Sequence, residues 1–350
     1  MVKARRGVTD AVRYVLGVLL GVVVLLLLFG KRAELLAARH QLSQVNLGWV
    51  AAAIAAEGLS LLTFAHLQRR VLGLSGARIG LGSLYLLTLA NDAIANTVPG
   101  EPAVSSAYRY RYYRRRGASG ASAGWTVFTI LIAQAIGMSM LLLLGVIVAL
   151  IGSTSIQRTG VTVIGLFIVV GAGAVLVRRD LVLRAAGAAV RGFRRLTGHP
   201  RGGIGARVDA TLARMREIPL STRSTVGIVA IAAAVWACDF GCLLCSFRAV
   251  HAPIPWDGAL LAYGVAQIVA SVPVIPGGIG VVEGSLAVLL AVYGANRVSA
   301  FSAAIAFRAV NFWLAIAIGW ISVAAIAQRE RRRGRNGAGG SAAERSRQRL

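Results

Sequence analysis

The stretch Trp125–Ile151, WTVFTILIAQAIGMSMLLLLGVIVALI, decides the fold, because it contains no charged side chain. About 20 such residues in a helix cross the roughly 30 Å hydrocarbon core of a bilayer. The chain of 350 residues is 57% apolar and only 15% charged, which leaves too few polar groups to cover a soluble protein. Five more apolar runs are of the same kind: Val12–Phe29, Leu47–Leu67, Val161–Val177, Thr225–Phe247 and Ala300–Ala327. The sequence therefore predicts an all-α, polytopic helical membrane protein.

The net charge of +25 comes from arginines that lie mostly between or beyond the apolar runs. The sequence contains no nucleic-acid-binding motif, so we expect no nucleic acid partner. The positive-inside rule explains the pattern instead, because it places basic loops in the cytoplasm. The loop of residues 178–223 has eleven arginines and three acids, and the tail after Gln328 has eight arginines. We therefore predict a multi-pass protein of the plasma membrane with both termini in the cytoplasm.

Three further apolar segments are shorter or broken: Ile79–Val98, Ala259–Ile275 and Ile279–Tyr293. If Ile79–Val98 crossed fully, the arginines of residues 109–116 and every later basic loop would be external. We therefore predict that this segment is re-entrant, entering from the cytoplasm and turning near Asn91–Pro99. The other two segments either both cross, which gives eight full crossings, or form one hairpin that dips in from outside, which gives six. We prefer eight.

The chain divides into a predicted transmembrane domain, residues 1–327, and a short tail. The 178–223 loop within the domain is typical either of an amphipathic helix on an anionic leaflet or of a solvated basic loop. The tail, residues 328–350, is rich in arginine, glycine, serine and alanine, which predicts disorder.

Two segments carry a Pro-Gly break inside an apolar run and a glutamate soon after it. The first contains Pro99-Gly100-Glu101, and the second contains Pro276-Gly277-Gly278-Ile279-Gly280 followed by Glu283. Helices end at such residues, because proline lacks a backbone donor and glycine allows positive φ. The two could be simple turns between helices. Paired broken helices in the two halves of a chain, however, indicate a transporter site and are compatible with an inverted repeat.

Ionisable side chains within the apolar runs are the sharpest candidates for function, because a carboxylate at membrane depth must pair, protonate or face water. Glu101 and Glu283 could bind a cationic group or a coupling proton, with Arg308 as their candidate partner. Asp92 and Asp239 could relay protons, although Asp239, like Glu57, could instead pair with an arginine. The candidate substrate-binding residues are Asn91, Asn96, Pro99, Gly100, Glu101, Pro276, Gly277, Gly278, Gly280, Glu283, Arg308 and Asn311.

We expect no catalytic residue, no cofactor and no metal site. Cys238, Cys242 and Cys245 fall on one helical face, where small apolar side chains pack between helices. Asn311 lies three residues after Arg308, so we expect the two side chains to share a helix face.

In this setting three features resemble the flippase-like family that shares the transmembrane domain of lysylphosphatidylglycerol synthases. They are NTVPGE (Asn96–Glu101) with the basic stretch after it, PVIPGGIGVVE (Pro273–Glu283), and Arg308. The resemblance covers about residues 10–327. It implies a multi-helix domain with re-entrant segments that moves a lipid with a charged or sugar-bearing head. In the synthases an aminoacyl transferase domain follows, whereas a basic tail of 23 residues follows here, so we do not expect synthase activity.

We therefore expect a membrane lipid translocase, not an enzyme, acting on a phospholipid or a lipid-linked envelope precursor. Its expected partners are membrane lipids, with anionic leaflet contacts through the basic loop and tail. The alternative is a non-transporting scaffold for a cell-envelope biosynthetic enzyme, and a homo-oligomer is also compatible with the sequence. A transferase acting on polyprenyl lipids is a weaker alternative, because Asp92 with Glu101 makes a poor metal cluster.

Overall fold

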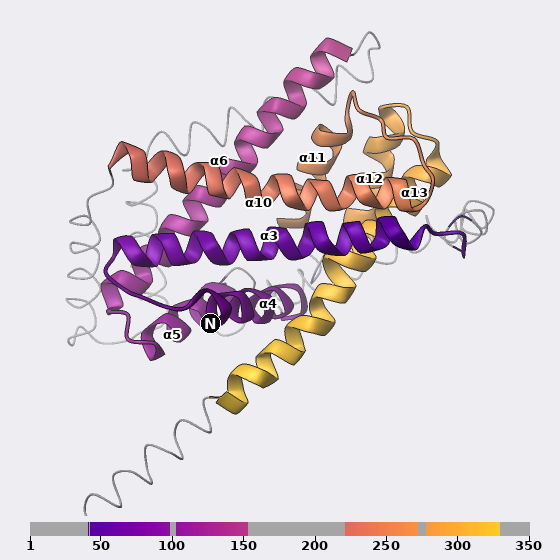
Figure 1. Ribbon diagram of the computed structural model, residues 1–350. Coiled ribbons are helices and arrows are strands. Elements are labelled where there is room, and N and C mark those ends of the chain that lie inside the picture. The colour runs from indigo at the N-terminus through magenta and orange to yellow at the C-terminus, as the bar shows by residue number, and fades with distance from the viewer. Residues whose placement is uncertain (1–40, 42, 99–102, 153–220, 272–277, 330–350) are drawn as a thin grey trace, which may run out of the picture.

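The computed structural model describes residue 41 and residues 43–98, 103–152, 221–271 and 278–329, and this part of the chain contains helices and no strand. The helices are α3 (Leu47–Leu74), α4 (Leu81–Thr97), α5 (Ala103–Arg115), α6 (Gly120–Gly152), α10 (Thr222–Ala249), α11 (Ala259–Ser271), α12 (Val281–Val292) and α13 (Arg297–Arg308) (Figure 1). After α13 comes a π-helical turn, η2 (Ala309–Leu314), and the helical run continues to Arg329. The predicted all-α class is confirmed.

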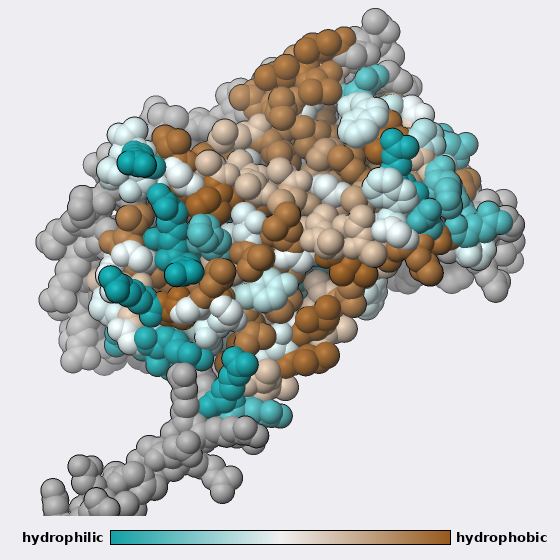
Figure 2. Space-filling model, in the orientation of Figure 1, coloured by the Kyte–Doolittle hydropathy of each residue, from teal (hydrophilic) through white to brown (hydrophobic). Residues whose placement is uncertain are grey.

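Four helices in the described residues are long and apolar enough to cross a membrane: α3, α6, α10 and the run Arg297–Arg329. At 1.5 Å per residue, the 28 residues of α3 extend about 42 Å, which exceeds the hydrocarbon thickness. Apolar side chains cover the middle of the bundle, and hydrophilic ones gather at its two ends (Figure 2). The chain is therefore an integral membrane protein. The predicted spans Val12–Phe29 and Val161–Val177 lie outside the described residues.

Helices α3 and α10 form an antiparallel pair at the centre of the bundle (Figure 1). The backbone N–H of Asn46, which caps the start of α3, donates to the carbonyl of Ala249 at the end of α10 over 2.9 Å. Midway along the pair, the Ser60 hydroxyl donates to the carbonyl of Val235 over 3.0 Å. This register brings residues near position 57 of α3 opposite residues near position 239 of α10.

Helices α4 and α5 form the first hairpin. The Tyr112 hydroxyl, near the end of α5, donates to the carbonyl of Ser83 at the start of α4 over 3.2 Å. The amide of Asn91 in α4 is oriented so that it bonds to both Ser105 and Arg109. Its nitrogen donates to the carbonyl of Ser105 at the start of α5 over 2.8 Å. The two helices are therefore antiparallel, and the chain leaves the hairpin at the end of the bundle where it entered. This is the geometry predicted for the re-entrant segment Ile79–Val98.

Helices α11 and α12 form a second hairpin, which corrects our preference for eight crossings. They have 13 and 12 residues, about 20 Å each, which is too short to cross the hydrocarbon core. Gly258, just before α11, lies so close to the ring of Tyr293, just after α12, that a Cβ at Gly258 would sit 1.8 Å from a ring carbon. Both ends of the hairpin thus lie at one end of the bundle, as in the six-crossing alternative.

The two halves of the chain repeat one pattern in opposite directions. In the first half, a long helix (α3) leads to a half-length hairpin (α4 and α5) and then to a long helix (α6). In the second half, α10 leads to the hairpin α11 and α12 and then to the run Arg297–Arg329. Because α3 and α10 are antiparallel, the two hairpins enter from opposite ends of the bundle. This arrangement is that of an inverted repeat.

The arginines of the described residues are unequally divided between the two ends. One end, where the first hairpin enters, carries Arg69, Arg70, Arg78, Arg111, Arg114, Arg115, Arg116, Arg223 and Arg329; the other carries Arg248 and Arg297. This bias is the one on which the predicted topology rests.

Candidate functional site

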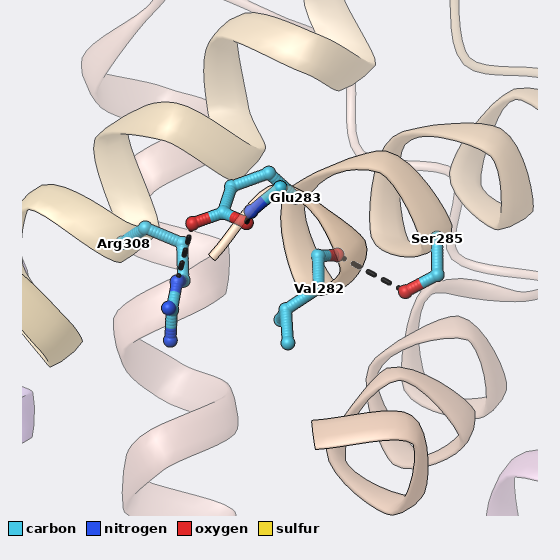
Figure 3. A network of polar contacts seen from close by, with 5 residues as sticks. Val282, Glu283, Ser285 and Arg308 are labelled. Carbon is cyan, nitrogen blue, oxygen red and sulfur yellow. Dashed lines mark hydrogen bonds and ion pairs between the residues drawn. The ribbon is translucent and has the colours of Figure 1, made fainter. Parts of the chain in front are cut away.

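The inner end of the second hairpin holds a buried ion pair between Glu283 and Arg308 (Figure 3). The Nε of Arg308 donates to Oε1 of Glu283 over 2.8 Å, and the two side chains are only 6% and 11% exposed. The guanidinium carbon of Arg308 also lies 3.9 Å from the ring centroid of Phe312, a cation–π contact. The predicted pairing of Arg308 with a membrane-depth glutamate is confirmed for Glu283.

The local sequence explains the position of Glu283. Gly278 and Gly280 have φ values of +61° and +82°, a region that favours glycine, and they turn the chain into α12. Glu283 is the third residue of α12, and its Oε2 accepts a hydrogen bond of 2.6 Å from the backbone N–H of Gly280. The carboxylate therefore caps the helix at the positive end of its dipole. Both of its oxygens have a partner, one from the backbone and one from Arg308.

A second polar cluster lies between α3, α10, α11 and η2, and we call it the carboxyl network: Glu57, Asp239, Tyr263, Gln267 and Asn311. The Tyr263 hydroxyl donates to Oδ2 of Asp239, and Gln267 donates to the same oxygen over 2.9 Å. The Asn311 amide donates to Oδ1 of Asp239 over 2.6 Å and to Oε2 of Glu57 over 3.3 Å. Glu57 and Asp239 are 7% and 4% exposed, so the network joins four helical elements in the protein interior.

The π-helical turn η2 lies at two side chains that we expected to share a helix face, Arg308 and Asn311. A π turn is wider than an α turn and often marks a functional position. Arg308 immediately precedes η2 and points to Glu283, whereas Asn311 within it donates to Asp239 and Glu57. Although Asn311 lies three residues after Arg308, the two side chains therefore contact different groups.

The first hairpin supplies further polar side chains. The carbonyl oxygen of Asn91 accepts from Arg109 Nε over 3.1 Å and from its Nη2 over 2.8 Å, and the guanidinium carbon lies 4.9 Å from the ring centroid of Phe64. Asn96 donates to the backbone carbonyl of Asp92 over 3.0 Å and to its Oδ1 over 3.3 Å. The contact of Arg109 with Phe64 therefore links this hairpin to α3.

The structure brings together only part of the predicted site. Glu283 with Gly278 and Gly280 meets Arg308, and Asp239 meets Asn311, while Asn91, Asp92 and Asn96 lie on α4. Five predicted residues lie outside the described part of the chain: Pro99, Gly100, Glu101, Pro276 and Gly277. No group of three or more histidine, cysteine, aspartate or glutamate side chains in the described residues could hold a metal ion.

Sequence reasoning missed Tyr263 and Gln267 and did not place Glu57 in the site. Their signal was present but weak, because each is a single polar residue between apolar neighbours in the sequence. Four residues separate Tyr263 from Gln267, so they share one face of α11. A second missed cluster ties α3, α4 and α5 together: Tyr113 donates to Oε1 of Gln68 over 2.6 Å, and Gln68 donates to Thr88 over 2.6 Å.

Comparison with known proteins identifies the family of this fold. Comparison with curated proteins gives no match. The family model described as the lysylphosphatidylglycerol synthase TM region matches residues 14–319. This match spans both hairpins, the ion pair and the carboxyl network, and it covers most of the chain. The protein therefore belongs to the family of the lysylphosphatidylglycerol synthase transmembrane region.

Proposed function

We propose that the protein is a membrane lipid translocase for a lipid with a polar or charged head, such as a phospholipid or a lipid-linked envelope precursor. The observation that carries this proposal is the Arg308–Glu283 pair, buried where a half-length hairpin ends inside the bundle. Charged side chains within membrane-spanning segments mark substrate or ion pathways, because burying them for stability alone is costly. An apolar pair of the same volume would hold the helices together at least as well.

The chemistry of the pair suits a lipid head group. An arginine guanidinium matches phosphate and carboxylate oxygens, so an anionic head group would compete with Glu283 for Arg308. A head group that carries an amine would in turn find the released carboxylate of Glu283. The ion pair would therefore open to bind either end of a zwitterionic head and close again after it leaves.

The two hairpins offer a path for such a head group. They enter from opposite ends of the bundle, and each carries polar side chains to its inner part. A head group would cross the hydrocarbon layer in two stages, one along each hairpin. It would stay in contact with protein while its acyl chains stay in lipid. This is the arrangement that broken helices in inverted repeats provide in transporters.

We also propose an orientation in the membrane. The arginine-rich end would face the cytoplasm of a plasma membrane, with both termini on that side. The 178–223 loop and the tail would contact anionic lipids of the inner leaflet. The partner would be a lipid that is moved and not chemically changed, so we propose transport and not enzymatic activity.

The test is lipid translocation in reconstituted vesicles. Purified protein is placed in vesicles that contain a phospholipid labelled on its head group, and the label in the inner leaflet is measured after chemical quenching of the outer one. We expect the wild type to move the label and both Glu283→Gln and Arg308→Ala to abolish movement. Arg297→Ala, an exposed arginine at the other end of α13, is the matched control and should retain it. Equal rates in all four proteins would refute the site, and a wild type that moves no lipid would favour the scaffold alternative.

A further inference from the structure

The carboxyl groups of Glu57 and Asp239 share one donor across the α3–α10 pair, because the Asn311 amide donates to Oε2 of Glu57 over 3.3 Å and to Oδ1 of Asp239 over 2.6 Å. Both side chains are buried, at 7% and 4% exposure. An ionised carboxylate can only accept hydrogen bonds, so neither carboxyl group can donate to the other while both are ionised. Two adjacent negative charges in the membrane interior would repel each other strongly. Because both groups are buried and share one amide donor, we expect the pair to hold a single proton.

The other hydrogen bonds indicate which carboxyl group carries this proton. Asp239 accepts from three donors, Tyr263, Gln267 and Asn311, and donors of this kind stabilise an ionised carboxylate. Glu57 receives one longer contact, 3.3 Å, from the same Asn311 amide. The asymmetry places the negative charge on Asp239 and the proton on Glu57.

We infer that Glu57 and Asp239 form a proton-binding site, with one exchangeable proton held on Glu57, and that release of this proton is coupled to lipid movement at Arg308. The coupling rests on the proposed function, whereas the proton site does not. In the exchange, Glu57 releases its proton to water on one side of the membrane and takes another from water on the other side. The pair changes from one negative charge to two, and no other group is consumed.

The groups around the pair are consistent with this assignment. Asp92 is the titratable acid of α4, which packs on α3. On α10 itself Cys238 and Cys242 lie nearby, and α11 contributes the Tyr263 hydroxyl. Helix α6, Gly120–Gly152, packs on α10 and has no titratable side chain. Glu283 of α12 forms an ion pair with Arg308 of α13.

Asn311 connects the proton site to the ion pair. Its amide bonds to both carboxyl groups, and it lies in the π turn that directly follows Arg308. Loss of the proton leaves two negative charges on either side of the Asn311 amide, and their repulsion moves the carboxyl groups apart and changes the position of Asn311. Because Arg308 is three residues away on the same helical run, the change reaches the head-group site without any intervening loop.

The proton is tested directly by infrared spectroscopy on the protein in nanodiscs of anionic phospholipid. At neutral pH we expect the C=O band of a buried carboxylic acid, which disappears at alkaline pH with the slope of one proton. Glu57→Gln should lack the band, and Asp239→Asn should lose or shift it. Asp257→Asn, at an exposed position outside the network, is the control and should keep it. A band unchanged in both Glu57→Gln and Asp239→Asn would overturn the site, as would a band that sodium removes at constant pH, since sodium would then be the bound ion.

The coupling is tested by translocation in vesicles under an imposed pH gradient. We expect the wild-type rate to change when the gradient is reversed, and Glu57→Gln, which keeps the pair neutral at position 57, to lose that response. A response that survives in Glu57→Gln would overturn the coupling. If the wild type moves no lipid but shows the infrared band, the proposed function fails and the proton site stands; if it moves lipid but lacks the band, the reverse holds.

Discussion

Separating the Arg308–Glu283 pair should destabilise the protein by a predictable amount. Removing one partner of a buried ion pair costs about 3–5 kcal/mol, because the other charge is left buried and alone. In Glu283→Gln the new amide can still accept from the Gly280 N–H, and Arg308 keeps its contact with Phe312, worth about 2 kcal/mol when desolvated. We therefore expect the lower end of the range, a loss of about 3 kcal/mol. Arg308→Met should cost a similar amount, because it leaves the Glu283 carboxylate without its cation.

The double variant separates the ion pair from general damage. With both charges gone no ion is left unpaired, so the double variant should be more stable than the two single effects predict by about 2–3 kcal/mol. The assay is reversible unfolding in mixed micelles of a mild detergent and dodecyl sulfate. The exposed Arg297→Met is the control and should change stability by less than about 0.5 kcal/mol. Single losses below about 1 kcal/mol, or single effects that simply add, would refute the reasoning.

Three further outcomes follow from the packing and the topology. Gly319→Ala should destabilise by about 1–3 kcal/mol in the same unfolding assay, because its Cβ would sit 2.4 Å from a backbone oxygen of α4; Gly284→Ala, with nothing within 4 Å, should not, and equal effects would contradict this packing. Tyr113→Phe should cost about 1 kcal/mol and speed hydrogen exchange in α5, since it removes a buried hydrogen bond; unchanged exchange would count against a role in holding the hairpin. Cysteines placed at Arg78 and Arg116, in a chain without its native cysteines, should react with an impermeant maleimide from the same side of the membrane, and labelling from opposite sides would exclude the first hairpin.

The first hairpin could be predicted from the sequence and the second could not, for a physical reason. The first hairpin is followed at once by the arginines of residues 109–116, so a full crossing would have placed them on the wrong side. Charge bias alone therefore excluded a full crossing by Ile79–Val98. The second hairpin has few charges near it, and a double crossing and a dip lead to the same orientation of the last helix. Only the contact of Gly258 with Tyr293 and the short lengths of α11 and α12 distinguish the two.

In the candidate site, too, one part could be predicted from the sequence and another could not. The sequence marked Glu57, Asp239, Glu283 and Arg308 as charges inside apolar runs, because the cost of a charge in hydrocarbon depends on its own segment. It could not assign their partners. Arg308 was a candidate for both glutamates and Asp239 for an arginine, whereas in the structure Asp239 bonds to Tyr263, Gln267 and Asn311.

By itself the sequence determined that this is a helical membrane protein, where the four long helices of the described residues run, and which charges needed an explanation. These are properties of single segments, set by apolar length and by the arginines at their ends. Only the tertiary structure decided the depth of the second hairpin, the split of Arg308 and Asn311 between two clusters, and the Asn311 amide that Glu57 and Asp239 share. Those depend on which helices pack together and in which register, and on one π turn that shifts a face of the last helix, and no local pattern contains that information.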